Sequence, residues 1–204
     1  AEPKALVSTP LEQTAPAGTL DAYAAHLLFV ALDRAGGLTP LGIGLPRDAI
    51  ARRCLRLPRH AAVLDSALDI LTRHGLVSAD GSHIRALTER AAVATAAAAM
   101  RPGLMTGAGQ AVAVIEACMT ALPAILGGET PAEDILFPGG ETGPVEHMLH
   151  GHDAGQARLR ALADATRAIV ASSAEPVRIL EVGAGTGMAT RAVVDALSPF
   201  AGRV

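Results

Sequence analysis

The residue types best suited to binding a small ligand lie in a glycine-rich turn near residue 185. The run Val177–Val182 is short and rich in β-branched residues, and Gly183-Ala184-Gly185-Thr186-Gly187 follows it directly. Helical spacing of apolar side chains then returns over Met188–Leu197. A strand, a glycine turn and a helix form the ligand-binding start of a doubly wound sheet. The glycines allow a tight turn and let a ligand approach backbone that has no Cβ.

The spacing of the glycines distinguishes between ligands. A dinucleotide-binding turn requires G-x-G-x-x-G, but Met188 occupies the place of its third glycine. A phosphate loop requires Gly-Lys-Ser/Thr, and the only lysine is Lys4. An acidic residue, here Glu181, two places before G-x-G-x-G resembles the first motif of S-adenosylmethionine-dependent methyltransferases. Glu181 would help to place the cationic amino group of that cofactor, and the alternative is a merely tight βα turn.

Composition and charge exclude several function classes. The net charge is −3, aromatic residues make up 2% of the chain and tryptophan is absent, which argues against a stacking platform for single-stranded nucleic acid. Cys54 and Cys118 cannot by themselves form a disulfide framework or a thiolate metal site. The most apolar stretch, Ala111–Leu126, is too short for a membrane span and contains Glu116. We therefore predict a buried helix of a cytoplasmic protein.

The segment before residue 88 has a winged-helix layout. Residues 1–18 contain three prolines and are predicted as an entry arm. Helices are expected over 19–35, 46–55 and 58–74, with a loop up to Leu45 and Pro46 as a first helical residue. A hairpin is expected to follow, with strands at 76–78 and 83–87 and a turn over Ala79–Ser82.

A winged helix serves either DNA binding or protein packing. Arg52, Arg53, Arg56 and Arg59 lie near the third helix and could contact phosphates. The start of that helix, however, carries Ala61-Ala62-Val63 where a recognition helix offers Arg, Asn or Gln. We therefore favour a packing or dimerisation module over a DNA-binding one.

The region between residues 88 and 173 is also predicted to be helical. Two helices are expected over 88–100 and 110–126, with a break at Arg101-Pro102-Gly103. An acidic turn then leads into the loop Leu136-Phe137-Pro138-Gly139-Gly140. After Pro144 the chain is predicted to be helical again, up to Ser172.

The order of these features resembles one family. A winged-helix-like start, a helical region, Leu136–Gly140, Val145-Glu146, a long helix and Val177–Gly187 resemble the N-terminal half of the C-methyltransferase domains of modular polyketide synthases. The resemblance implies a mostly α fold: a winged-helix-like, helical lid subdomain followed by the first βα unit of a Rossmann-like class I methyltransferase core. The expected domains are residues 19–175 for the lid, with its winged-helix-like part at 19–87, and 176–204 for the start of the core.

The resemblance also implies an activity and partners. The complete domain would transfer a methyl group from S-adenosylmethionine to the α-carbon of an acyl chain on an acyl carrier protein, beside neighbouring synthase domains. Whether it forms a homodimer is left open by the sequence. No residue of this chain is expected to be catalytic. The implied cofactor contacts are Glu181, Gly183, Ala184, Gly185 and Gly187, with Phe137 and Gly139 in the lid loop. The family often has an aromatic residue soon after Val-Glu, whereas this chain has His147-Met148-Leu149-His150.

The histidines near residue 150 form a second candidate site. If the segment is one helix, Glu146, His150 and Asp153 share a face, as do His147 and His150, which is the spacing of a carboxylate–imidazole metal site. Because Pro and Gly flank the segment, which also contains His152, we favour a solvated helix end with no metal ion.

Three functional interpretations remain open on the sequence. In the first, the chain is the lid part of an active C-methyltransferase; because few residues follow Gly187, we expect this piece alone to be inactive and to bind the cofactor weakly or not at all. In the second, it is a vestigial methyltransferase-like adaptor that packs against a neighbouring synthase domain. In the third, it belongs to a small-molecule O-methyltransferase. We expect Gly185→Val to abolish cofactor binding through a clash at the turn.

Overall fold

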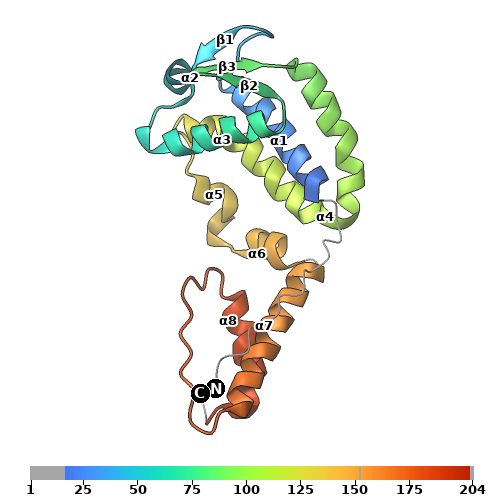
Figure 1. Cartoon of the computed structure of the whole chain (residues 1–204), viewed down its shortest axis with the longest axis vertical. Helices are drawn as coiled ribbons and strands as arrows, with labels where there is room; N and C mark the ends of the chain where they lie inside the picture. Colours follow the sequence, from blue (N-terminus) through green and yellow to red (C-terminus); the bar gives the residue numbers. More distant parts are fainter. Residues whose placement is uncertain (1–16, 152, 203–204) are drawn as a thin grey trace. The chain divides into compact units, whose positions relative to one another are not determined.

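The computed structural model describes residues 17–151 and 153–202 (Figure 1). These residues form two compact units, Gly18–Leu149 and the described residues from His150 onward. The expected entry arm lies outside the described residues except at its end, where the first helix already begins at Ala17. The expected boundary between lid and core at residue 176 stays a prediction.

The first unit begins with the predicted winged-helix layout. Its elements are α1 (Ala17–Arg34), β1 (Gly44–Pro46), α2 (Arg47–Cys54), the 3-10 helix η1 (Pro58–His60), α3 (Ala61–Arg73), β2 (Val77–Asp80) and β3 (His83–Ala86). The side chains of Phe29, Ile50, Leu68 and Ile84 are almost fully buried together in one core cluster. Helical and alternating apolar spacing in the sequence therefore corresponds to real buried faces.

The sheet has one strand more than the sequence predicts. The order is β1-β3-β2, with both pairs antiparallel and Leu45 opposite Ile84. The prediction of a loop up to Leu45 is wrong for β1. Gly44 and Pro46 are typical of loops, but here they are the two ends of an edge strand that pairs with β3. The hairpin turn is also tighter than expected: Asp80 pairs with His83, which leaves Gly81 and Ser82 as the loop, and Gly81 has a φ of +59°.

The helix α4 (Arg90–Leu126) replaces the two helices expected over 88–126. The predicted break at Arg101-Pro102-Gly103 is wrong, because the helix continues through Pro102 and loses its helical dihedral angles at Ala108 instead (φ −134°, ψ 24°). Ala97 and Leu104, on either side of Pro102, are both buried in one cluster with Tyr23 of α1. This packing holds the backbone helical where proline removes a hydrogen bond.

The bend at Ala108 folds α4 back on itself, and α1 lies alongside (Figure 1). Arg101 before the bend and Glu116 after it form an ion pair, with Nε 2.6 Å from Oε1. The Tyr23 hydroxyl donates to the same carboxylate at 2.5 Å. By length and composition, α4 is the one described helix that meets the criteria for a membrane span, which core helices of soluble proteins also meet.

Short helices complete the first unit. They are α5 (Ala132–Leu136), the 3-10 helix η2 (Pro138–Gly140) and α6 (Gly143–His150). The acidic turn expected at 132–136 is thus one turn of helix. It contacts α4 at one end and leads into the Pro-Gly-Gly segment at the other.

The second unit consists of α7 (Asp153–Ser172), an extended segment, α8 (Met188–Leu197) and the 3-10 helix η3 (Ser198–Phe200). Helices α7 and α8 pack side by side (Figure 1), and α8 has the bounds that the sequence predicts. Val177–Val182 is extended but is not assigned as a strand. A strand is defined by hydrogen bonds to a neighbour, and none of the described strands pairs with this segment.

Candidate functional site

The glycine turn adopts a backbone that requires glycine at three positions. Gly183, Gly185 and Gly187 have φ values of +77°, +56° and +79°, in the left-handed region that residues with a Cβ rarely occupy. The Gly187 N–H donates to the Ala184 carbonyl at 2.9 Å and closes the turn. The G-x-G-x-G spacing therefore has a conformational cause in the structure.

The space around the turn is open. A Cβ built at Gly183 or Gly187 would meet no atom within 4 Å, and one at Gly185 would meet only the Gly183 carbonyl oxygen at 3.9 Å. A Cβ at Gly185 therefore meets no close atom of the described residues, and a β-branched residue there is strained by the positive φ; the expected loss of cofactor binding in Gly185→Val stays a prediction. The bare backbone faces a volume that a ligand can enter.

The turn leads directly into the N-terminus of α8. Gly187 is the N-cap residue and has no side chain to cap the helix, and its carbonyl accepts the Arg191 N–H at 2.9 Å. The first backbone N–H groups of a helix have no acceptor within the helix, and they give its start a partial positive charge. The free backbone N–H groups of α8 and the glycine backbone of residues 183–187 therefore lie next to each other.

Glu181 lies beside this point and is oriented by α8. Its Oε2 accepts a hydrogen bond of 2.5 Å from the Thr190 hydroxyl. The carboxylate itself is exposed. Glu181, the three glycines and Ala184 lie together at the start of α8, and their role as cofactor contacts stays a prediction. Thr190 is a neighbour that the motif alone does not reveal.

A cavity of about 510 Å³ lies between α7, α8 and the extended segment. Its lining is mostly aliphatic and includes Leu162 of α7, Ile179 and Leu180 of the extended segment, and Val193 of α8. Glu181 is the one charged residue of that lining. The cavity is therefore unlike the polar surroundings that a charged ligand needs on most sides.

Phe137 and Gly139 belong to the first unit, so their position relative to the glycine turn is not described. Phe137 ends α5, and its N–H donates to the Glu133 carbonyl at 2.7 Å. Gly139 is exposed with a φ of +65°, and nothing lies within 4 Å of a Cβ built there. The segment is an ordered turn with an open glycine, and its role as a cofactor contact stays a prediction.

The histidine segment is not one continuous helix. The helix α6 ends at His150 and α7 begins at Asp153, so Glu146, His150 and Asp153 do not share a helix face. Glu146 accepts a hydrogen bond of 2.9 Å from the Thr142 hydroxyl just before α6. No group of three potential metal ligands occurs among the side chains that the structure describes, which do not include those of His147, His152 and Asp153.

The winged-helix surface has mixed charge. Arg47 pairs with Asp65 and Asp69 of α3, at 3.1 and 2.9 Å. Arg52 pairs with Asp48 one turn earlier. Carboxylates thus engage Arg47 and Arg52, whereas Arg53, Arg56 and Arg59 form no ion pair within the described part of the chain, so these pairs alone do not decide between protein packing and phosphate contacts.

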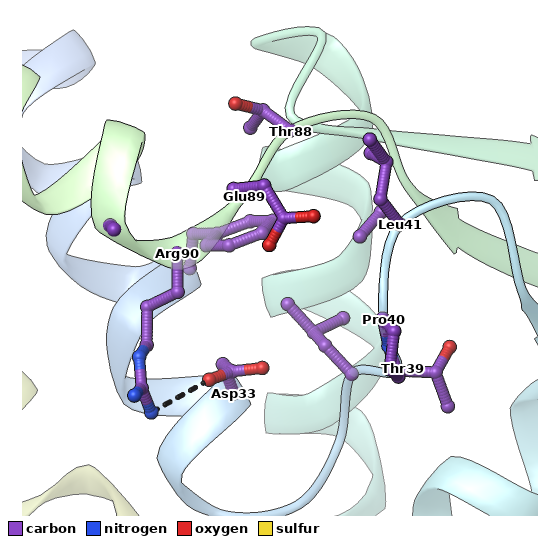
Figure 2. A pocket seen from close by; sticks show the side chains of 11 residues that line it. Asp33, Thr39, Pro40, Leu41, Thr88, Glu89 and Arg90 are labelled. Atoms are coloured by element: carbon purple, nitrogen blue, oxygen red, sulfur yellow. Dashed lines mark hydrogen bonds and ion pairs between the residues drawn. The ribbon is translucent and has the colours of Figure 1, made fainter.

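The first unit contains a smaller cavity, of about 370 Å³, that no sequence motif predicts. Figure 2 shows Asp33 of α1 joined to Arg90 of α4, with Glu89 beside them and the loop of Thr39–Leu41 opposite. The Asp33 Oδ2 lies 3.1 Å from the Arg90 guanidinium. These residues come from three distant segments, so no local pattern could have found them.

Comparison with known proteins places the chain among polyketide synthases. It is 36% identical over 169 residues to polyketide synthase ThaQ of Burkholderia thailandensis, which covers 77% of this chain and 8% of that protein. Polyketide synthases PksR and PksM of Bacillus subtilis match 44% of the chain at 37% and 33% identity. The chain thus spans a small part of each synthase, and no family model matches it.

Two solved structures share the fold. The DszA carbon methyltransferase superposes with a TM-score of 0.82 at 23% identity, over 91% of this chain and 50% of that one. The CurJ carbon methyltransferase superposes with a TM-score of 0.72 at 17% identity, over 90% and 50%. The chain is therefore a polyketide synthase segment with the fold of a carbon-methyltransferase-like domain, about half as long as the methyltransferase chains that it matches.

Proposed function

We propose that this chain forms the cofactor-binding turn and the helical lid of an S-adenosylmethionine-dependent C-methyltransferase in a polyketide synthase. The observation that carries the proposal is the conjunction at residues 181–190: three left-handed glycines, the N-terminus of α8 and a carboxylate held by Thr190. S-adenosylmethionine, when bound, supplies an electrophilic methyl group on a sulfonium.

The residues at the turn fit the polar end of that cofactor. The backbone at Gly183 and Gly187 is open, so a ligand can come into van der Waals contact with it. The donors at the start of α8 favour a carboxylate. The Glu181 carboxylate favours an ammonium group, and an amino acid moiety carries both charges. The chain's own contribution is therefore binding and orientation.

We assign the acceptor to a β-ketoacyl group on an acyl carrier protein. Methylation at an α-carbon requires an acidic C–H, which a neighbouring ketone and thioester provide, and the relatives are multidomain polyketide synthases. A carrier protein and adjacent synthase domains are then the partners, in the cytoplasm. In this proposal the winged-helix part packs against protein, either a neighbouring domain or a second copy of the chain, and not against DNA.

The test uses the synthase polypeptide that carries this chain. We expect calorimetry to give micromolar affinity for S-adenosylmethionine, weakened about tenfold or more by Glu181→Gln because a charged hydrogen-bond partner is lost. Glu175→Gln is the matched control, an exposed carboxylate that lies before the extended segment. Mass spectrometry of the carrier-bound acyl chain reports the methyl transfer.

The adaptor function predicts a different result. A synthase that binds no S-adenosylmethionine and leaves the acyl chain unmethylated would overturn the proposal in favour of a non-catalytic packing domain. An acyl chain left unmethylated together with methylation of a free hydroxyl compound would favour the O-methyltransferase.

A further inference from the structure

Three aliphatic side chains are exposed at one end of the winged-helix sheet. Leu41, Ile43 and Leu87 are 49%, 55% and 52% exposed. Because Gly44 pairs with Arg85, Ile43 and Leu87 lie at the same end of β1 and β3. Leu41 also lines the cavity of about 370 Å³. Aliphatic side chains gathered in this way on a surface are typical of a contact with another protein.

The cavity itself has an apolar floor and a charged rim. Phe29 and Leu38, two of its lining residues, belong to the core of the first unit and are 1% and 8% exposed. On the rim, Asp33 engages the Arg90 guanidinium, with 3.1 Å between Oδ2 and Nη1. Glu89 forms no ion pair with another described residue, and Figure 2 shows its carboxylate directed toward the loop on the other side of the cavity. Two carboxylates and one guanidinium line the cavity, so a net negative charge remains beside apolar surface.

A lysine or arginine side chain has the chemistry that this cavity complements. Its methylene stem can lie on the apolar floor while its cationic head stays hydrated and reaches the Glu89 carboxylate. An anionic group would instead be repelled by the net negative charge. The exposed aliphatic side chains next to the cavity would then contact an aliphatic residue that neighbours this lysine or arginine in the partner.

We propose that the cavity and the adjoining Leu41, Ile43 and Leu87 form a docking site for a protein segment in which an aliphatic residue neighbours a lysine or arginine. The segment belongs to another domain of the same synthase polypeptide, since this chain matches 8% of a relative that unites many domains in one polypeptide. The inference rests on the proposed packing of the winged-helix part against protein and names the surface that packs. It does not rest on the methyl transfer, because a non-catalytic domain can dock in the same way.

Photo-cross-linking in the synthase polypeptide tests the docking directly. With p-benzoylphenylalanine in place of Leu41, we expect mass spectrometry to identify a cross-linked peptide from another domain of the same polypeptide. That peptide should carry a lysine or arginine within one helical turn of the cross-linked residue. The matched control has the same probe in place of Val63, which is 47% exposed on α3 and lies outside the cavity lining, and it should not give this product. A cross-link to a second copy, a cross-linked segment without a basic residue, or no product beyond the control would each overturn the proposal.

Charge variants test the part that Glu89 plays. Glu89→Lys should lower the yield of the cross-link from position 41 about tenfold or more, because like charges then face each other. Glu89→Gln removes only the attraction and should lower the yield about two- to fivefold. Glu129→Lys is the control at an exposed carboxylate of the same unit outside the cavity lining, and it should leave the yield unchanged. A yield that Glu89→Lys does not lower would overturn the proposal.

Reversing the charge of the partner completes the cycle. When the lysine or arginine of the cross-linked peptide is changed to glutamate, Glu89→Lys should restore the yield, and failure to restore it would overturn the assigned ion pair. Calorimetry with S-adenosylmethionine distinguishes this inference from the proposed function. The expected cross-link without cofactor binding leaves the docking site standing and removes only the methyl transfer, whereas cofactor binding without the cross-link does the reverse.

Discussion

The Thr190 hydroxyl donates a hydrogen bond of 2.5 Å to Oε2 of Glu181 and so ties the end of the extended segment to the first turn of α8. The two residues lie on either side of the glycine turn. The bond therefore fixes where the carboxylate points relative to the backbone donors of α8. It gives Glu181 a defined direction despite its exposure.

Removing the Thr190 hydroxyl should weaken cofactor binding in the synthase polypeptide. We expect Thr190→Val to raise the Kd for S-adenosylmethionine about fivefold, because one hydrogen bond that orients the carboxylate is lost while the side-chain volume is kept. Thr190→Ser retains the hydroxyl and should bind nearly as tightly as the parent. Calorimetry measures both, and equal affinities for the valine and serine variants would contradict the assigned role.

The loss of stability caused by a substitution at Gly185 should depend on backbone strain and not on side-chain size. Its φ is +56° and open space surrounds it, so valine, alanine and asparagine differ chiefly in how well they tolerate the left-handed region. We expect Gly185→Val to lower the melting temperature most, Gly185→Ala less and Gly185→Asn least. The left-handed conformation costs an ordinary residue about 1–2 kcal/mol of unfolding free energy relative to a residue that tolerates it.

The matched control for this series is Gly103→Ala. Gly103 lies within α4, its φ is not positive and nothing surrounds a Cβ built there. Alanine should therefore stabilise the helix by about 0.5–1 kcal/mol. If asparagine at 185 destabilised the chain as much as valine, contact with a neighbour rather than the sign of φ would be the cause. Thermal unfolding by circular dichroism gives the order.

The spacing of apolar residues and glycines in the sequence predicted those elements whose conformation depends on residues close together in the chain. The helix at 188–197, the winged-helix order and the left-handed glycines all follow from periodicity or from the need for residues without a Cβ. The strand β1 was missed because its pairing with β3 is a tertiary interaction between ends occupied by Gly44 and Pro46. The break in α4 was misplaced because packing of Ala97 and Leu104 against α1 holds the helix through Pro102. Thr190 and the Asp33–Arg90 pair join residues that no local window relates.

Tyr23 should remain un-ionised to unusually high pH. Burial and then the hydrogen bond to the Glu116 carboxylate raise the pKa of Tyr23 from 10 to about 12. Because the folded pKa lies above the unfolded one, the associated stability is fully present below pH 10 and is lost as the pH rises through about 12. Tyr23 is the only tyrosine and there is no tryptophan, so tyrosinate absorbance reports this residue alone.

Glu116→Gln separates the two causes of the Tyr23 shift. It removes the charge that opposes ionisation but leaves the phenol buried, so the pKa should fall yet stay above 10. Glu129→Gln is the control at a carboxylate that does not contact Tyr23. Absorbance titration with parallel circular dichroism distinguishes ionisation from unfolding. Half-titration of the folded parent near pH 10 would show that Tyr23 is neither buried nor bonded as described.

The two cysteines should differ sharply toward alkylating reagents. Burial raises the pKa of Cys54 to about 11, its side chain is 5% exposed, and its Sγ lies 3.6 Å from the Ala35 carbonyl oxygen. At pH 8 roughly a thousandth of this thiol is ionised, and the thiolate is the reactive form. Burial also raises the pKa of Cys118, but that side chain is only half-buried. Iodoacetamide should therefore modify Cys118 first.

The Cys118→Ser variant isolates the buried thiol. In this variant we expect Cys54 to remain unmodified at pH 8 until denaturant unfolds the first unit. Cys54 should then react as fast as Cys118 does in the folded parent. Gly37 offers a second control, because a Cβ built there would lie 2.7 Å from the Cys54 sulfur. Gly37→Ala should loosen this contact and speed alkylation of Cys54 without unfolding the chain. Equal rates for both cysteines in the folded parent, measured by mass spectrometry, would place Cys54 outside the core that α1, α2 and α3 form.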